Sequence, residues 1–316
     1  MEELTHAHRA ILRFLKKGQY TVSELANVTS FSQQTIRARM AEMKRLGYAI
    51  EALKATGENF RYYIPARPLE KHLKDITHTG ANHYRIALVS DTHIGAVTED
   101  LESLHKFYKI AHEKGVTEFY HSGDITDGTG VYPGHISELK VYTGMKQVEY
   151  ASANYPEIKG CKTYFITGNH DLKLMQREDI DVGPMIASRR PDMIYLGQYE
   201  ADVYFEKAKL RLIHPDGGMP YAISYRMQKY VENIAGGTKP SIIQMGHLHQ
   251  SAYMEIRNIH CFLSGSFQKQ NNFLRRKGVD PQISGWIIDF DLINKLVDGI
   301  KVTEVNNMRP YKVRFY

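Results

Sequence analysis

The sequence has little cysteine and no long apolar run, and each shortage excludes a class of protein. Only Cys161 and Cys261 occur in 316 residues, and each lies in a stretch that reads as strand. Two isolated thiols exclude a disulfide framework and a thiolate zinc site, so we assign them to core packing and expect a reducing compartment. No apolar run approaches the roughly 20 residues that span a bilayer. Residues 1–10 are charged and polar rather than signal-like, so we expect a cytoplasmic protein without membrane contact.

The charge of the chain is unevenly distributed. The whole sequence is 42% hydrophobic and 24% charged, as in ordinary globular proteins, and its length suggests two domains. The net charge is +6, which is compatible with a polyanionic partner but does not require one. Residues 1–66 carry ten Lys or Arg against six Asp or Glu, a net charge of +4 on about a fifth of the length. The basic excess therefore belongs mainly to the N-terminal segment.

The N-terminal segment has the spacing of three short helices. Residues 6–15 place apolar side chains on one face, which predicts the first helix. Thr21 and Glu24 form a capping-box pattern, so a second helix is expected to begin there. A third is expected from Ser32, its N-cap, to Gly47, which can end it.

Two short runs that read as strands follow these helices. Residues 48–53 and 60–64 flank a turn and predict a hairpin. Three helices and a hairpin resemble a winged helix-turn-helix domain, which we place at residues 1–66. Residues 67–83 read as a linker, and a second domain is expected over residues 84–316.

The resemblance implies a way of binding DNA. In winged helix-turn-helix domains the third helix enters the major groove. Side chains suited to base edges and phosphates lie on its polar face, namely Gln33, Gln34, Arg37, Arg39 and Lys44. Winged helices also serve as protein-interaction or dimerisation modules, and that alternative stays open.

In the second domain, apolar strands repeatedly end in Asp, Asn or His. The five blocks are residues 85–90 before Asp91 and His93, 116–121 before Asp124, 163–167 before Asn169, 209–213 before His214, and 242–245 before His247 and His249. Strand ends at one sheet edge converge in space, so ligands distant in sequence can meet. Oxygen and imidazole ligands without thiolate suit manganese, iron or zinc.

These five blocks, in this order, resemble the calcineurin-like metallophosphoesterase superfamily over residues 84–316. The resemblance implies an α/β fold in which a two-sheet β-sandwich is flanked by helices. It also implies two divalent metal ions as cofactors, manganese first, with iron, zinc or nickel as alternatives.

The resemblance further implies a role for each side chain. One metal would be bound by Asp91, His93 and His249, the second by Asn169, His214 and His247, and both by Asp124. His170 would stand beside the scissile phosphate, and Asp171 would orient His170. A hydroxide bridging the two metals would attack phosphorus in line.

Several other polar residues have less distinctive surroundings. Asp127 is expected either at the site or as a cap of a helix or turn. His121 is expected to be structural. Surface or packing roles are expected for His105, His112, His135 and His260. The insertion at residues 129–154 is expected to form a lid or a homodimer contact.

The surroundings of the metal ligands indicate the substrate. Gly-Asn-His-Asp at residues 168–171 and Leu-Ser-Gly-Ser at residues 263–266 are similar to the double-strand-break repair nucleases of the superfamily. A helix is expected over residues 220–234 with Ile223 on its inner stripe. On another face, Arg226 and Lys229 either contact substrate phosphate or are simply solvated. The basic segment 268–277 is expected to be a loop that could line a groove for a nucleic-acid strand.

The C-terminal region adds two expected strands, residues 285–291 and 299–304, which would close the second sheet. Taken together, the sequence predicts a metal-dependent hydrolase, a phosphodiesterase that acts on nucleic acid, with DNA favoured (a nuclease). One alternative is a small-molecule or cyclic-nucleotide phosphodiesterase, or a phosphatase, with a regulatory N-terminal domain. Another is a non-enzymatic DNA-binding protein whose metal domain has fallen out of use.

Overall fold

The computed structural model describes residues 5–16, 18–45, 50–53, 60–63, 76–294 and 296–312. The chain divides into two compact units, Met1–Leu69 and Glu70–Tyr316. None of the helices in the described ranges combines the length and the apolar character that crossing a bilayer requires.

Within its described part, the N-terminal unit has three helices and a two-stranded antiparallel sheet. The elements are α1 (His6–Leu15), α2 (Val22–Thr29), α3 (Gln33–Arg45), β1 (Glu51–Leu53) and β2 (Arg61–Tyr63). Thr21 caps α2 as expected, because its hydroxyl accepts from the Glu24 amide at 3.1 Å and its own amide donates to Glu24 at 2.7 Å. Leu25, Ile36 and Met43 are buried between the helices. The winged-helix assignment stays a prediction, and the turn expected at residues 54–59 lies outside the described residues.

The second unit contains two mixed sheets. In the larger one, the described strands run in the order β15-β14-β13-β4-β5-β6-β7. They are β4 (His83–Val89), β5 (Glu118–Ser122), β6 (Lys162–Thr167), β7 (Met193–Gln198), β13 (Ser284–Ile293), β14 (Leu296–Asn306) and β15 (Arg309–Lys312). β4 to β7 are parallel, so their carboxyl ends lie at one edge.

In the smaller sheet, the described strands run in the order β11-β12-β10-β9-β8-β3. They are β3 (Ile76–His78), β8 (Glu200–Phe205), β9 (Ala208–Ile213), β10 (Ile242–Met245), β11 (Ala252–Ile256) and β12 (Ile259–Leu263). β9, β10 and β12 are parallel. β3 lies in the segment expected as a linker, yet it pairs with β8, so that stretch enters the sheet of the second unit.

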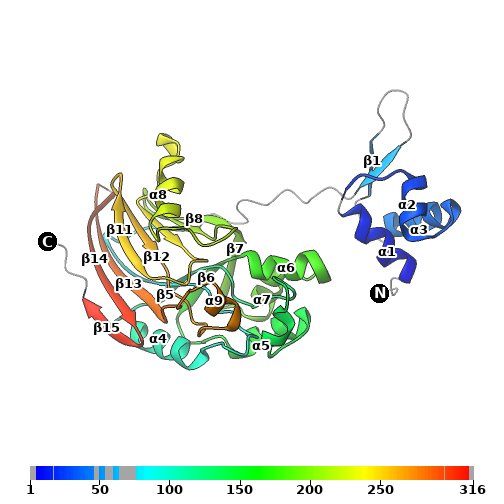
Figure 1. Ribbon diagram of the computed structural model, residues 1–316. Helices are drawn as coiled ribbons and strands as arrows, with labels where there is room; N and C mark the ends of the chain where they lie inside the picture. The colour runs from blue at the N-terminus through cyan, green and yellow to red at the C-terminus, as the bar shows by residue number, and fades with distance from the viewer. Residues whose placement is uncertain are drawn as a thin grey trace. The chain divides into compact units, whose positions relative to one another are not determined.

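The two sheets pack face to face and helices cover their outer faces (Figure 1). Alternation along β4 explains this arrangement, since Ile86 and Leu88 face the smaller sheet while Ala87 and Val89 face helices. The helices and helical turns are α4 (Leu101–Glu113), α5 (Gly144–Asn154), α6 (Asn169–Glu178), α7 (Val182–Arg189), α8 (Tyr225–Glu232), α9 (Asn272–Arg276), η1 (His135–Glu138) and η2 (Gly236–Thr238). The expected two-sheet α/β architecture is confirmed.

Two local expectations were wrong. β13 and β14 do not close the smaller sheet; β13 pairs antiparallel with β4, with Trp286 opposite Leu88. The helix expected over residues 220–234 is only α8, since residues 221–224 form bends and turns and the Tyr225 amide donates to Ala222 O at 3.0 Å.

Both cysteines are free and buried, as core packing requires.

Candidate metal centre

The expected ligands follow the ends of β4, β5, β6, β9 and β10, in loops except for Asn169, which is the first residue of α6. Five of them have a left-handed backbone with positive φ, namely Asp91, His93, Asp124, His247 and His249. This conformation is uncommon for residues other than glycine, and strained residues cluster at functional sites. Sharp turns at the strand ends therefore direct these side chains toward one place.

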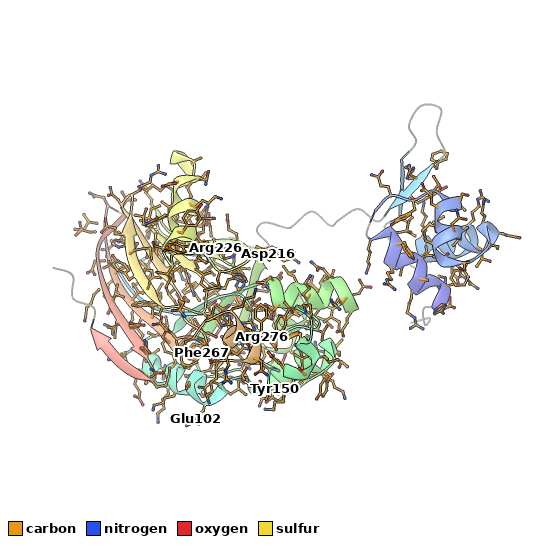
Figure 2. All side chains as sticks on the ribbon, in the orientation of Figure 1. Glu102, Tyr150, Asp216, Arg226, Phe267 and Arg276 are labelled. Carbon is orange, nitrogen blue, oxygen red and sulfur yellow. The ribbon has the colours of Figure 1, made fainter. Side chains whose placement is uncertain are left out.

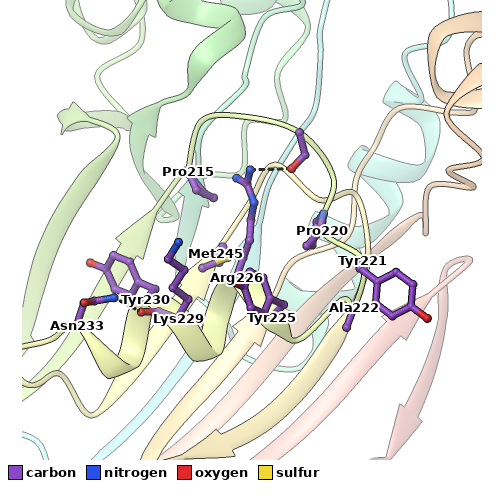
Figure 3. A pocket seen from close by; sticks show the side chains of 11 residues that line it. Pro215, Pro220, Tyr221, Ala222, Tyr225, Arg226, Lys229, Tyr230, Asn233 and Met245 are labelled. Atoms are coloured by element: carbon purple, nitrogen blue, oxygen red, sulfur yellow. Dashed lines mark hydrogen bonds between the residues drawn. The ribbon is translucent and has the colours of Figure 1, made fainter.

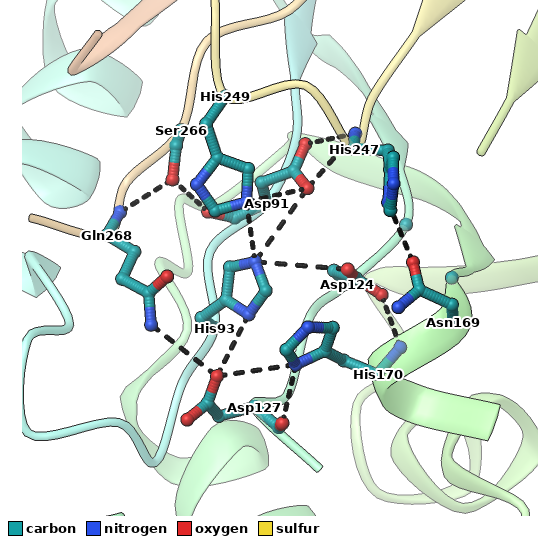
Figure 4. A network of polar contacts seen from close by, with 12 residues as sticks. Asp91, His93, Asp124, Asp127, Asn169, His170, His247, His249, Ser266 and Gln268 are labelled. Atoms are coloured by element: carbon teal, nitrogen blue, oxygen red, sulfur yellow. Dashed lines mark hydrogen bonds and ion pairs between the residues drawn. The ribbon is translucent and has the colours of Figure 1, made fainter. Parts of the chain in front are cut away.

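Asp91, His93 and His249 form the first cluster (Figure 4). Nε2 of His93 lies 3.1 Å from Nε2 of His249 and 3.7 Å from Oδ1 of Asp91. Nε2 of His249 lies 3.4 Å from the same carboxylate oxygen. All three side chains are buried.

Asp124, Asn169, His214 and His247 form the second cluster. Nε2 of His214 lies 3.1 Å from Oδ2 of Asp124 and 3.1 Å from Oδ1 of Asn169. Nδ1 of His247 lies 2.8 Å from the same Asn169 oxygen. Each of these four candidate ligand atoms therefore lies within 3.1 Å of at least one other.

Asp124 contacts both clusters. Its Oδ2 lies 3.9 Å from Nε2 of His93 in the first and 3.1 Å from Nε2 of His214 in the second. Ligands bound at about 2.0–2.2 Å around one ion are themselves roughly 3–4 Å apart, so these separations fit two neighbouring metal ions. The donor set of carboxylate, amide oxygen and imidazole, without thiolate, fits a divalent transition metal.

The other nitrogen of three of the four histidines is fixed by a protein oxygen. His93 Nδ1 lies 3.0 Å from Asp127 Oδ1, His214 Nδ1 lies 2.7 Å from Ser122 O, and His247 Nε2 lies 2.6 Å from Gly217 O. Such contacts fix the tautomer and aim the remaining nitrogen at a metal. His249 differs, because its buried Nδ1 has no partner in the described part of the chain.

His170 lies beside both clusters at the start of α6. Its Nδ1 lies 2.7 Å from the backbone oxygen of Asp127, and its ring centroid lies 4.5 Å from that of His93. The expectation that Asp171 orients His170 is not met. The Asp171 carboxylate instead accepts from the backbone amides of Ile125, Thr126 and Gly168, at 3.1, 2.8 and 3.0 Å. Asp171 thus ties the Asp124 loop to the first turn of α6.

The sequence analysis anticipated only part of a buried polar network around Asp127. Asp127 occupies the site, the first of its two expected roles, and its Oδ2 lies 3.0 Å from Nε2 of His135. His135 was expected at the surface or in packing; it is buried and belongs to this network. Gln268 Nε2 lies 3.5 Å from Asp127 Oδ1. His135 has no motif spacing, so only its position in the 129–154 insertion offered a signal.

Residues 84–277 match the calcineurin-like phosphoesterase superfamily domain. The chain belongs to this superfamily.

Relatives of this superfamily member bear the name DNA polymerase II small subunit. The protein from Methanothermobacter thermautotrophicus is 23% identical over 63% of this chain and 50% of its own length. That from Methanocaldococcus jannaschii is 24% identical over 62% of this chain and 40% of its own length. The chain therefore spans about half the length of these relatives or less.

Solved structures with a related arrangement are only loosely similar to this superfamily member. An archaeal phosphodiesterase is 14% identical, with a TM-score of 0.40 over 71% of this chain and 99% of that one. Vacuolar protein sorting 29 from Cryptosporidium parvum is 12% identical, with a TM-score of 0.40 over 74% and 97%. Likenesses this loose carry no functional meaning.

The electrostatics of the centre favour positive charge. Burial would raise the pKa of Asp124, but nearby histidines, His214 first, hold it well below its usual value. Burial would lower the pKa of His93, yet hydrogen bonds to Asp127 and Asp91 raise it to about 10. Buried carboxylates thus draw a proton onto a neighbouring ring, which is the compensation that a bound cation would supply. Burial lowers the pKa of His247 to about 4 and favours the neutral ring that a metal needs.

Arg226 and Lys229, the expected nucleic-acid contacts of the second unit, belong to neither ligand cluster. Arg226 lies near Asp216 (Figure 2) and donates to the backbone oxygens of Asp216 and Gly218, both at 2.7 Å. Lys229 lines the same pocket as Arg226 (Figure 3). In the N-terminal unit, Arg39 pairs with Glu42 at 2.6 Å. The other expected contacts on α3 are exposed, namely Gln33, Gln34, Arg37 and Lys44.

The remaining histidines are held by structural contacts, as expected. His121 is buried, with Nε2 3.3 Å from the Thr92 hydroxyl. His105 Nε2 lies 2.9 Å from the backbone oxygen of Asn154, and His260 Nδ1 lies 2.8 Å from the Tyr253 hydroxyl. The partners in these three contacts are a hydroxyl or a backbone oxygen, not a candidate metal ligand.

Proposed function

We propose that the chain is a phosphodiesterase that depends on two divalent metal ions and hydrolyses nucleic acid. The observation that carries the proposal is the position of Asp124, whose Oδ2 faces His93 in one cluster and His214 in the other. Asp91, His93 and His249 would hold one ion, Asn169, His214 and His247 the second, and Asp124 both. When bound, such ions lower the pKa of water and neutralise charge that develops on a phosphate.

The protein's own groups would then handle the proton. Because His170 Nδ1 is occupied by the Asp127 backbone oxygen at 2.7 Å, its Nε2 is the nitrogen left to face a substrate. A protonated His170 would donate to the leaving oxygen, which would otherwise depart as an unstable alkoxide. The Asp127 carboxylate also lies 3.5 Å from Nδ1 of His170, so both the backbone and the side chain of Asp127 lie beside this ring.

Nucleic acid is favoured by two features. The matched relatives bear the name of DNA polymerase II small subunits, and the N-terminal unit presents exposed Arg37 and Lys44 on α3. The word subunit in that name also favours a second candidate, a non-catalytic member of a DNA-associated assembly. Ionised carboxylates aimed at a shared centre argue for catalysis, because a retired site has no reason to keep them buried.

A substrate panel tests the proposal. Full-length protein with Mn²⁺ would be incubated with single- and double-stranded DNA, RNA, cyclic nucleotides and simple phosphomonoesters. We expect cleavage of nucleic acid that is abolished by Asp124→Asn and unchanged by Asp298→Asn, an exposed carboxylate on β14. If only small phosphoesters are turned over, they replace nucleic acid as the proposed substrate class. If nothing is turned over although two ions are bound, the result favours the non-catalytic candidate.

A further inference from the structure

A pocket of about 710 Å³ adjoins the metal centre through one short segment. Pro215, on its wall, directly follows the expected ligand His214. Two residues later, the backbone oxygen of Gly217 holds Nε2 of His247 at 2.6 Å. The wall of the pocket and the second metal cluster are therefore built from the same loop.

The pocket presents aromatic rings to solvent (Figure 3). Tyr221 is fully exposed and Tyr225 is 54% exposed, although rings of this size are usually packed. Their neighbour Ile223, expected on a buried helix stripe, is exposed as well. Bends and turns at residues 221–224 replace the first part of the expected helix; Tyr221 lies within them, and Tyr225 is the first residue of α8.

The same pocket carries unneutralised positive charge. Arg226 and Lys229 both line the pocket, and within the described residues neither forms an ion pair with a carboxylate. The two recorded hydrogen bonds of Arg226 go to backbone oxygens at 2.7 Å, which leaves its charge unpaired. Exposed π-faces beside free cations suit a ligand that has both an aromatic ring and negative charge.

We propose that this pocket binds a nucleobase next to the scissile phosphodiester, with Tyr221 and Tyr225 stacking on the base and Lys229 facing the adjacent phosphate. The inference rests on the proposed function, because it names the part of a nucleic-acid strand that enters beside the metals. A base must be unpaired to stack in this way, so the occupant is a single strand or a frayed end.

The assignment is tested by comparing strands with and without bases, and Tyr221 variants with and without the aromatic ring. Fluorescence anisotropy would measure the binding of full-length protein to short oligothymidylate and to an abasic strand of equal length, with chelator present to prevent cleavage. We expect the protein to bind oligothymidylate about tenfold more tightly than the abasic strand, and this preference to collapse in Tyr221→Ala. Tyr221→Phe, which keeps the ring, should retain it.

The charge is tested separately with a matched pair of lysines. Lys229→Gln should lower the slope of log affinity against log salt by about 0.7 on both strands. Lys207→Gln changes an exposed lysine in the turn before β9, whereas His214 follows the other end of that strand, and it should leave the slope unchanged. The N-terminal unit is identical in all variants, so its contribution cancels.

The outcomes separate this inference from the proposed function. Equal loss on both strands in Tyr221→Ala, or no loss on either, overturns the base-stacking pocket even if the protein cleaves nucleic acid. A base preference that depends on Tyr221 in a protein that hydrolyses no phosphodiester overturns the proposed function and leaves the pocket standing.

Discussion

His93 and Asp127 form a buried pair that determines which nitrogen of His93 faces the metal centre. Nδ1 of the ring lies 3.0 Å from Oδ1 of Asp127, while Nε2 lies 3.1 Å from Nε2 of His249. Both side chains of the pair are about 1% exposed, so water does not compete for the contact. The carboxylate thus acts on the centre through the histidine.

Asp127→Asn should weaken the binding of metal without removing a ligand. The neutral amide supports the His93 ring less well, and such losses typically cost about 10- to 100-fold in metal affinity. Calorimetric titration with Mn²⁺ would measure the change. Asp298→Asn serves as the control, and wild-type affinity in Asp127→Asn would contradict a supporting role for Asp127.

His170→Ala should reduce turnover while metal binding persists. Loss of a proton donor costs about 100- to 10,000-fold in kcat, and the loss should be larger for an alkoxide than for a nitrophenolate leaving group. Steady-state rates on a nucleotide ester and a nitrophenyl ester would show the contrast. An equal loss on both substrates would assign His170 to binding or to charge stabilisation instead.

Chelation should destabilise the second unit. Asp91 and Asp124 are 0% and 1% exposed, and burial leaves their negative charge poorly solvated without a cation. Each metal ion, saturated at about 100 times its dissociation constant, should add about 2.7 kcal/mol to the free energy of unfolding. Thermal melts with Mn²⁺ and with chelator measure this, and coincident melts would mean that no ion binds.

The sequence could predict which candidate ligands come together, because each follows a strand and parallel strands deliver their ends to one edge. His135 could not be found in this way, since it reaches Asp127 from an insertion whose path no periodicity reveals. The role of Asp171 was misjudged for a related reason. Adjacency in sequence placed it beside His170, whereas the first turn of α6 directs its carboxylate to the amides of Ile125 and Thr126. Strand existence could be predicted for β13, but not its partner β4.

A buried ion pair outside the site should make the free energy of unfolding depend on pH in the acidic range. Arg211 donates to both oxygens of Asp202, at 2.6 and 2.7 Å, across β8 and β9. Burial would raise the pKa of Asp202, but Arg211 and then Lys209 hold it below its usual value. The pair therefore contributes stability above about pH 4, the unfolded pKa of aspartate, and loses it as pH falls through the lowered folded pKa.

Asp202→Asn should lower the free energy of unfolding by about 3 kcal/mol near neutral pH, because it leaves the Arg211 charge buried without its main partner. Urea titrations at neutral and acidic pH would show a difference that shrinks with acid. The exposed Asp298→Asn should change little at either pH. A difference that grows toward low pH would contradict the sign of the Asp202 pKa shift.

The polar face of α3 should bind duplex DNA mainly through phosphate contacts. Arg37 and Lys44 are exposed, whereas Arg39 is engaged by Glu42 at 2.6 Å. Arg37→Gln and Lys44→Gln should each weaken binding and lower the salt slope of log affinity by about 1. Arg39→Gln should have a smaller effect on the slope, because its charge is already paired.

Anisotropy over a salt series would measure all three variants against Arg13→Gln, an exposed arginine on α1. Equal slopes in every variant would remove α3 as the DNA-contacting helix and favour the protein-interaction alternative for the N-terminal unit.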